Sequence, residues 1–343
     1  MRSGLCAQFG FKAEAVVGTA VTVDRFLPVA SFNPTLSKSE VVSEGVRGCA
    51  TTPLVDDSVI VGRSASGQLA TDVRSKGFGP LLRQILGAVS GPTVIGATPL
   101  YRQIHTPGDL TGVSLTVQAG FPESYSSTVA PFTYRGAKVT NATFSCARGG
   151  LLSLSLDLDM WDEDTATALA VDTYPTGWEV FSWAGFSATI GGTPATATGR
   201  TTISGGAAIK GLRGISLPFA LGLATDRVFA GGNGIKSEQI ENAMRSYTGE
   251  LDVEFADRAQ LHALFSAHTT TALQFTWTGK VDLGTGAYPV LRVTYPQAKL
   301  LTGSPTLQGP DIIPAQTTFR AYGDPAGTHP AVQIEYEAAD TTL

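Results

Sequence analysis

Hydrophobic and polar residues alternate along much of this chain, as they do in strands that bury one face. In residues 150–159 the apolar positions are Leu152, Leu154, Leu156 and Leu158, and the polar positions are Ser153, Ser155, Asp157 and Asp159. Residues 132–146 alternate too, and we expect 132–159 to form a hairpin-like pair of strands in one sheet. The pattern returns in residues 248–255, with Glu250, Asp252 and Glu254 opposite Leu251, Val253 and Phe255.

Two short segments have helical spacing instead. Residues 78–89 repeat leucine and isoleucine at helical intervals and carry Pro80 in the first turn, where a missing N–H costs nothing. A shorter helix is predicted after Asp257, whose carboxylate can cap it, with Leu261 and Leu264 on one face. Each helix is amphipathic enough to pack on a sheet.

Segments rich in glycine, serine and proline complete the expected elements. Residues 58–73 are interpreted as two strands around a Ser/Gly turn, and residues 19–36, with two prolines, as an extended arm. Residues 191–206 (GGTPATATGRTTISGG) are expected to be a long exposed or mobile loop.

One order of motifs occurs twice along the chain. SGQLATDV, a helix and YRGAKV from Tyr134 are followed by TGELDVEF, a helix and YPQAKL from Tyr295, at an offset of roughly 160 to 180 residues, the size of one domain. This favours an internal duplication, with domains at 1–172 and 173–343; the alternative is two unrelated β domains. The predicted fold class is mainly β, with two tandem β-sandwich or half-barrel units, each flanked by one short α-helix.

Composition supports the β assignment and narrows the function. The 343 residues are 43% hydrophobic and 15% charged, and 39 Gly and 19 Pro provide the turns that many short strands need. The net charge of −5 and the scattered Lys and Arg argue against a protein that grips nucleic acid through its phosphates. Three widely spaced cysteines do not suggest disulfides, so we expect buried free thiols.

The sequence also argues against membrane insertion or export. No apolar run approaches the ~20 residues that span a bilayer. Lys12 and Glu14 would interrupt the apolar part of a signal peptide. We therefore expect no membrane insertion by this chain.

Catalytic and metal-binding patterns are incomplete. Residues 231–238 (GGNGIKSE) lack the glycine before Lys236 that a phosphate-binding loop needs. In 157–164 (DLDMWDED), Trp161 occupies the place of a third calcium ligand, and no glycine follows to turn the loop. We predict no catalytic residue, cofactor or metal, and hence no enzyme.

Several short motifs together resemble a known family. GTAVTVDRFLPV near the N-terminus, EGVRG at 44–48, SGQL followed by LLRQILG, YRGAKV and YPQAKL are similar, in this order, to the tail tube proteins of long-tailed bacteriophages in their longer form. The resemblance implies a structural virion protein, made in the bacterial cytoplasm, that forms the tail tube for genome passage. In shorter members six single-domain chains make a ring, so two fused units imply three chains per pseudo-sixfold ring, with a true hexamer as the alternative.

Such a tube sets physical requirements for the chain. Its rings must stack, contact other tail proteins at the ends, and let DNA pass transiently without holding it. Arms and loops would carry the stacking, and the candidates are residues 1–36 and 191–206. An acidic wall would keep DNA mobile, and the lumen-facing candidates are Asp157, Asp159, Glu250, Asp252 and Glu254; the outer solvated face of a sandwich is an equally good place for any one of them.

A different class of function remains open from the residues alone. A β-sandwich module that binds carbohydrate or a host receptor would also be mainly β and rich in exposed loops. Exposed tryptophans beside a calcium site would favour it, but the acidic segment 157–164 is a poor calcium loop.

Overall fold

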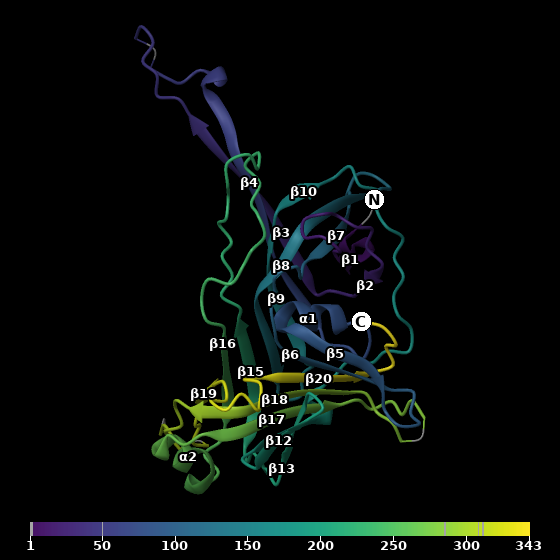
Figure 1. Ribbon diagram of the computed structural model, residues 1–343, viewed down its shortest axis with the longest axis vertical. Coiled ribbons are helices and arrows are strands. Elements are labelled where there is room, and N and C mark those ends of the chain that lie inside the picture. Colours follow the sequence, from purple (N-terminus) through teal and green to yellow (C-terminus); the bar gives the residue numbers. More distant parts are fainter. Residues whose placement is uncertain (1–2, 50, 285, 308, 311) are drawn as a thin grey trace.

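The computed structural model describes residues 3–49, 51–284, 286–307, 309–310 and 312–343 (Figure 1). The mainly β prediction is confirmed. Strands of the first half are β1 (Gln8–Ala13), β2 (Arg25–Phe26), β3 (Ser31–Val42), β4 (Ser58–Asp72), β5 (Gly87–Val94), β6 (Tyr101–Pro107), β7 (Leu115–Pro122), β8 (Val129–Ala147), β9 (Ser153–Met160) and β10 (Asp162–Asp164). Those of the second are β11 (Phe186–Ile190), β12 (Thr193–Ala197), β13 (Arg200–Ser204), β14 (Ala207–Ala208), β15 (Leu212–Ala220), β16 (Ser246–Val253), β17 (Thr271–Thr278), β18 (Val290–Leu300), β19 (Thr317–Ala321) and β20 (Gln333–Ala338).

The two predicted helices are present, as α1 (Gly79–Leu86) and α2 (Ala263–Ala267). Helix α1 has its proline in the first turn and ends at Gly87, whose φ of 91° suits glycine. Asp257 caps the second helical segment by accepting a hydrogen bond from the Gln260 amide at 2.9 Å. This segment begins as a π-helical turn, Arg258–His262, before α2. Short 3-10 turns occupy Gly4–Cys6, Val55–Asp57 and Trp183–Gly185.

The first half builds two sheets that share strand β8. One sheet has the order β3–β4–β9–β8, and the other has the order β2–β1–β7–β8–β10. Strand β8 passes from one sheet to the other near Gly136, whose φ of 61° is in the left-handed region. The alternating segment 132–159 thus forms the expected antiparallel pair, β8 with β9.

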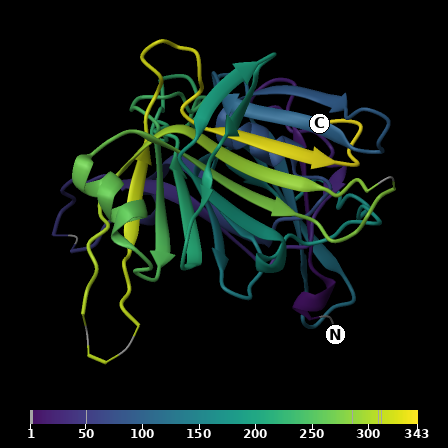
Figure 2. The same ribbon diagram turned by 90° about the horizontal axis from the view of Figure 1, so that it is seen from below.

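The second half has the same order of strands. Its sheets are β15–β16–β19–β18 and β14–β11–β17–β18–β20, and again one long strand, β18, takes part in both. Figure 2 shows β17, β18 and β20 side by side. Among the described residues, the hairpins β5–β6 of the first half and β12–β13 of the second have no counterpart in the other half.

The halves are joined by strand pairing and by a common core. Residues 141–147 of β8 pair with residues 214–220 of β15, so the first sheets of the two halves form one continuous run. On the other side, β6 pairs with β20. One hydrophobic cluster extends through both halves, and at the β8–β15 junction it contains Phe144, Leu217 and Phe219.

Three expected segments differ from the structure. Residues 58–72 form one strand rather than two, because Gly62 and Gly67 sit within a ladder to β3 that continues to Val42; the distal part of this hairpin projects from the body (Figure 1). Residues 191–206 are not simply a loop, since β12 and β13 pair within them. The expected arm is largely packed into the fold: β1 pairs with β7, and Phe26 and Phe32 are buried.

Candidate functional site: a polar sheet face between two free edges

A polar face covers the continuous run of strands β3–β4–β9–β8–β15–β16–β19–β18. The leucines of β9 are buried on one side of the sheet, while Ser155 and Asp157 emerge on the other. At the junction, an open groove of about 530 Å³ is lined on this face by Ser145, Ser153, Ser216, Glu250 and Asp252. The alternation in sequence therefore separates a core-facing side from a solvent-facing side across both halves.

The two candidate carboxylates of β9 have different surroundings. Asp157 is half-buried and accepts hydrogen bonds from Gln68 Nε2 at 2.9 Å and from Asn141 Nδ2 at 3.2 Å, so it lies within the polar face. Asp159 is only 8% exposed, and Lys236 Nζ lies 2.5 Å from its Oδ1. Burial raises the pKa of Asp159, and the Lys236 ammonium opposes that rise.

The three candidates of the second half cluster at β16 and the residue after it. Glu250 is half-buried and faces Ser216 across the β15–β16 pair. Asp252 is exposed, with Arg213 Nη2 3.0 Å from its Oδ1, and Glu254 lies 3.9 Å from Nη1 of the same guanidinium. Strands β8 and β15 separate β16 from β9, so the structure brings Glu250, Asp252 and Asp157 to one face without direct contact.

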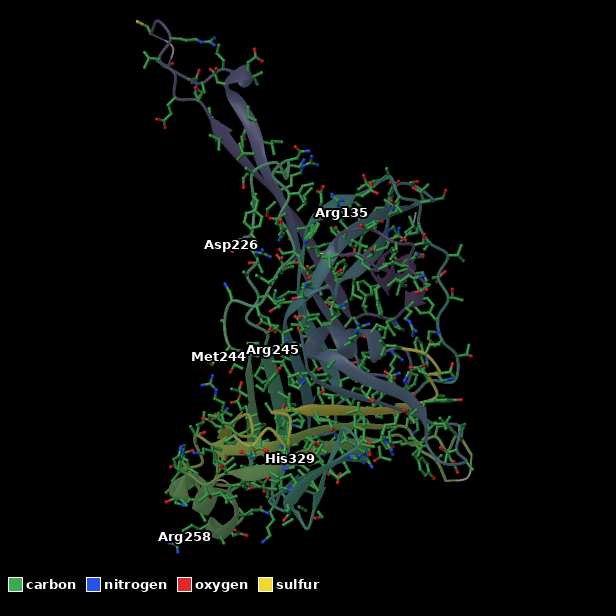
Figure 3. The ribbon with its side chains drawn as sticks, in the orientation of Figure 1. Arg135, Asp226, Met244, Arg245, Arg258 and His329 are labelled. Carbon is green, nitrogen blue, oxygen red and sulfur yellow. The ribbon has the colours of Figure 1, made fainter. Side chains whose placement is uncertain are left out.

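Residues 221–245, which we name the clasp, connect β15 to β16 and fold over the first half. Lys138 of β8 is 1% exposed, and its Nζ lies 2.6 Å from Glu238 Oε1 and 2.7 Å from the Leu110 carbonyl oxygen. Burial lowers the pKa of Lys138, while the hydrogen bond that Lys138 donates to Glu238 raises it. Arg245, labelled in Figure 3, lies at the other end of the clasp. Its Nη1 donates to the Leu86 carbonyl oxygen at 3.0 Å.

The clasp was not predicted from the sequence. Lys138 and Glu238 are 100 positions apart, and the motifs that contain them say nothing about their pairing. The clasp explains why Asp159 is covered although its alternation matches that of Asp157. One signal could have suggested a buried cation with a partner. Lys138 follows YRGA directly and lies within a strand, where a lysine is unusual.

Both ends of the continuous run of strands have an unpaired side. Strand β3 pairs with β4, and among the described residues no strand pairs with its other edge. At the far end, residues 302–307 continue β18 without being a strand. Thr302 Oγ1 lies 2.9 Å from Thr318 Oγ1, and the Thr306 amide donates to the Pro314 carbonyl at 3.2 Å, so this segment follows β19 and the residues before it.

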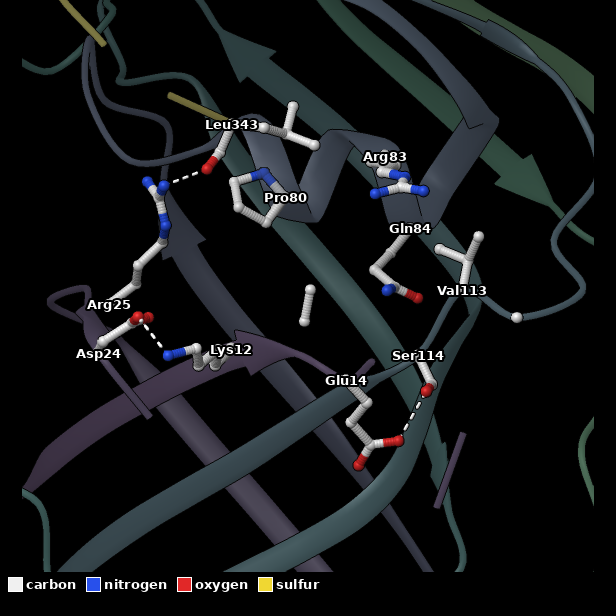
Figure 4. A pocket seen from close by; sticks show the side chains of 12 residues that line it. Lys12, Glu14, Asp24, Arg25, Pro80, Arg83, Gln84, Val113, Ser114 and Leu343 are labelled. Atoms are coloured by element: carbon white, nitrogen blue, oxygen red, sulfur yellow. Dashed lines mark hydrogen bonds and ion pairs between the residues drawn. The ribbon is translucent and has the colours of Figure 1, made fainter. Parts of the chain in front are cut away.

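A polar pocket near the N-terminal segment contains several paired charged groups. In this cavity of about 240 Å³, Lys12 Nζ pairs with Asp24 at 2.7 Å (Figure 4). Glu14 is buried and accepts hydrogen bonds from Ser114 Oγ at 2.6 Å and from the Gly18 amide at 2.7 Å. These bonds hold the N-terminal segment against the body, and we assign the pocket no ligand.

The chemistry available elsewhere is limited. The described residues hold no group of three or more His, Cys, Asp or Glu side chains placed to bind a metal ion. Cys146 is buried as expected, but Cys6 and Cys49 are exposed. In the described part of the chain no helix is both long and apolar enough to cross a bilayer.

Comparison with known proteins identifies a family. The family model described as phage tail tube protein matches residues 4–321, nearly the whole chain. No curated protein matches it. The matched range includes the first half from residue 4, the clasp, both edges of the continuous run of strands, and the second half as far as the end of β19.

Proposed function

Because this chain belongs to the phage tail tube protein family, we propose that it builds its tube from two tandem units per chain and three chains per ring. The protein is a structural component of the virion tail, where it assembles into the tube through which the genome passes. The proposal concerns how that tube is made from this chain and which face lines it.

The observation that carries the proposal is a common register in the two halves. In the β8–β9 pair Lys138 faces Asp159, and in the β18–β19 pair Lys299 faces Arg320. Each residue of the second pair lies 161 positions after the corresponding residue of the first pair. The next rung repeats this displacement, with Val139 facing Leu158 in one half and Leu300 facing Phe319 in the other.

The repeated motifs also occupy equivalent rungs. Gly67 of SGQL faces Leu158, and Gly249 of TGEL faces Phe319. Tyr134 faces Val117 beside a register shift in the β7–β8 pair, and Tyr295 faces Leu273 beside the corresponding shift in β17–β18. A slip of one residue would move every side chain to the opposite face, so agreement at several pairings supports tandem copies of one unit.

The proposed units are residues 1–172 and 173–343. Strand β10 ends at Asp164 and β11 begins at Phe186, so the proposed boundary falls between the last strand of one unit and the first of the next. Each unit contributes four strands to the continuous run. If a ring needs six such units, as the family resemblance implies, three chains close it.

Closure would remove the free edges that a single chain leaves open. An unpaired edge offers a row of N–H and C=O groups to any strand, and a head-to-tail contact that closes into a ring satisfies them. We propose that the polar face lines the lumen, with Asp157, Glu250 and Asp252 on its surface. Carboxylates there repel the DNA phosphates.

The ring composition can be tested by mass per length. Tubes assembled from purified chain are weighed by scanning transmission electron microscopy, and the ring spacing is measured from the same fields. Three chains of 35.7 kDa per ring are expected, half the mass that six would give. Six chains per ring would refute the three-chain ring, and discrete monomers under all assembly conditions would refute tube formation by this chain alone.

The lining face can be tested by neutralising its carboxylates. The triple variant Glu250→Gln, Asp252→Asn, Glu254→Gln removes three negative charges from β16 and the residue after it, two of which lie within 4 Å of Arg213, so the lumen becomes more attractive to phosphate. Phage carrying it should assemble normal tubes but eject DNA more slowly, measured by the appearance of nuclease-sensitive DNA. Unchanged ejection with normal tubes would contradict the assignment of this face to the lumen.

A further inference from the structure

We propose that neighbouring chains in a ring join through a copy of the β8–β15 junction, with β3 of one chain pairing to residues 302–307 of the next. The proposal rests on the tandem-unit ring described above and adds a defined register to it. It places Phe32 opposite Leu307, Asn33 opposite Thr306, and Leu36 opposite Gly303 of the adjoining copy.

The template is the contact between units inside one chain. There Ile215 of β15 faces Cys146 of β8, and Ser216 faces Ser145. Ile215 and Cys146 are 5% and 1% exposed, so the apolar side of this junction is part of the core. The polar side carries the serines that line the groove.

Strand β3 of the first unit is equivalent to strand β15 of the second. Asn33 of β3 faces Gln68 of β4, and Phe32 faces Leu69. The rungs of β15 with β16 are the same, with Ser216 facing Glu250 and Ile215 facing Leu251. The edge of β15 that pairs with β8 is therefore equivalent to the edge of β3 that no described strand covers.

Residues 302–307 stand in the second unit where residues 141–146 of β8 stand in the first. Asn141 Nδ2 donates to Asp157, and 161 positions later Thr302 bonds to Thr318. Ser145 faces Ser153. At the same displacement, the Thr306 amide donates to the Pro314 carbonyl. The offset of 161 positions that relates β8 to β18 therefore also relates residues 141–146 to residues 302–307.

The side chains of the two edges fit this register. On β3 the apolar positions are Phe32, Pro34 and Leu36, and the polar positions are Asn33, Thr35 and Ser37. On the other edge the apolar positions are Gly303, Pro305 and Leu307, and the polar positions are Thr302, Ser304 and Thr306. The proposed register sets apolar against apolar and polar against polar, whereas a slip by one residue would oppose the two kinds.

Two further features favour this register. In the proposed pairing Pro34 lies directly opposite Pro305 of the adjoining chain. The two residues that cannot donate a backbone N–H are therefore confined to one position of the ladder between the chains. Leu307 is 78% exposed in the single chain, and the residue equivalent to it, Cys146, is buried. A second copy of the chain would supply the cover that Leu307 lacks.

The register can be tested by disulfide formation within assembled tubes. The exposed thiols are first removed with Cys6→Ser and Cys49→Ser. In that background the pair Asn33→Cys, Thr306→Cys should crosslink on mild oxidation, because directly opposed residues of antiparallel strands lie within the Cα separation that a disulfide accepts. The matched control, Asn33→Cys with Ser304→Cys, uses the same face but is displaced by two residues.

The in-register pair should give about tenfold more covalent product than the control, since a diagonal pair exceeds disulfide geometry. In a three-chain ring this product should be a ladder that stops at the trimer on non-reducing gels. Equal or greater crosslinking of the control, in tubes that form normally, would overturn the register and leave the tube function intact. Absence of tubes from the unaltered chain would instead count against the proposed ring.

A second measurement tests the register even if the cysteine variants fail to assemble. In a reconstruction of tubes of the unaltered chain, the residue that faces Asn33 across the chain boundary should be Thr306. Any other residue in that place, or an edge of β3 that contacts no neighbouring chain, would overturn the proposal.

Discussion

Replacing Phe219 with alanine tests the junction between the two halves, because this ring packs on residues from both. Its centroid lies 5.7 Å from that of Phe144 in β8, 5.4 Å from Tyr247 in β16 and 6.5 Å from Tyr295 in β18. The side chain is 1% exposed. Phe219→Ala therefore leaves a cavity at the centre of the contact through which the halves form one sheet.

The expected cost follows from this burial. Truncating a fully buried phenylalanine to alanine removes about 3 to 5 kcal/mol of unfolding free energy, from lost transfer energy and from the cavity. Three aromatic neighbours leave little freedom for the site to collapse, so we expect a loss of about 4 kcal/mol. Because one cluster spans both halves, unfolding should remain a single transition.

The assay is urea unfolding of unassembled chain, followed by tryptophan fluorescence. The matched control is Phe229→Ala, since Phe229 is 56% exposed and its loss should cost less than about 1 kcal/mol. A loss below about 1 kcal/mol for Phe219→Ala would refute the junction as a shared core. Two separate transitions in the unaltered chain would also refute it.

Three further predictions concern other sites. His105 is fully buried, and burial, helped by a nearby arginine, lowers its pKa from 6.5 to about 3. As pH falls from 6.5 towards 3, the His105 imidazole is protonated in the unfolded chain but not in the folded one, so the unaltered protein loses about 1.4 kcal/mol of unfolding free energy per pH unit. His105→Leu should abolish this loss, which is measured by comparing the unfolding curves of the two proteins across this pH range. Glu238→Gln removes the carboxylate that contacts the buried Lys138 ammonium and should cost about 3 kcal/mol in urea unfolding, whereas Glu241→Gln, at a more exposed side chain, should cost under about 1 kcal/mol; equal costs would contradict the buried pair. Leu36→Ala, which trims a side chain partly buried against the core, should lower the unfolding free energy of the single chain by no more than about 2 kcal/mol but raise the critical concentration for tube assembly, measured by sedimentation, about tenfold; unchanged assembly would argue against Leu36 at a chain boundary.

Local signals in the sequence predicted the elements that depend on local physics. The alternation of β9 and the cap at Asp257 appear in the structure as expected, because side-chain period and end-capping are decided within a few residues. The repeated Tyr-x-x-Ala-Lys motif marked the two strands that pass between sheets.

Long-range pairing was beyond the same signals. Alternation assigned Asp157 and Asp159 to one face, but it could not show that Lys236 in the clasp covers Asp159. The N-terminal segment looked like an arm because its prolines and β-formers fit an edge strand. Its burial depends on contacts with β7, about 100 positions away, which no local pattern encodes.

The central claim, that two like units in each chain join edge to edge into a closed ring, is tested most directly by a cryo-electron microscopy reconstruction of the assembled tube without imposed sixfold symmetry. The account predicts three chains per ring, six similar units around the axis, and the face that bears Asp157 and Glu250 turned to the lumen. A ring of six chains, or a lumen lined by the opposite layer of strands, would contradict it.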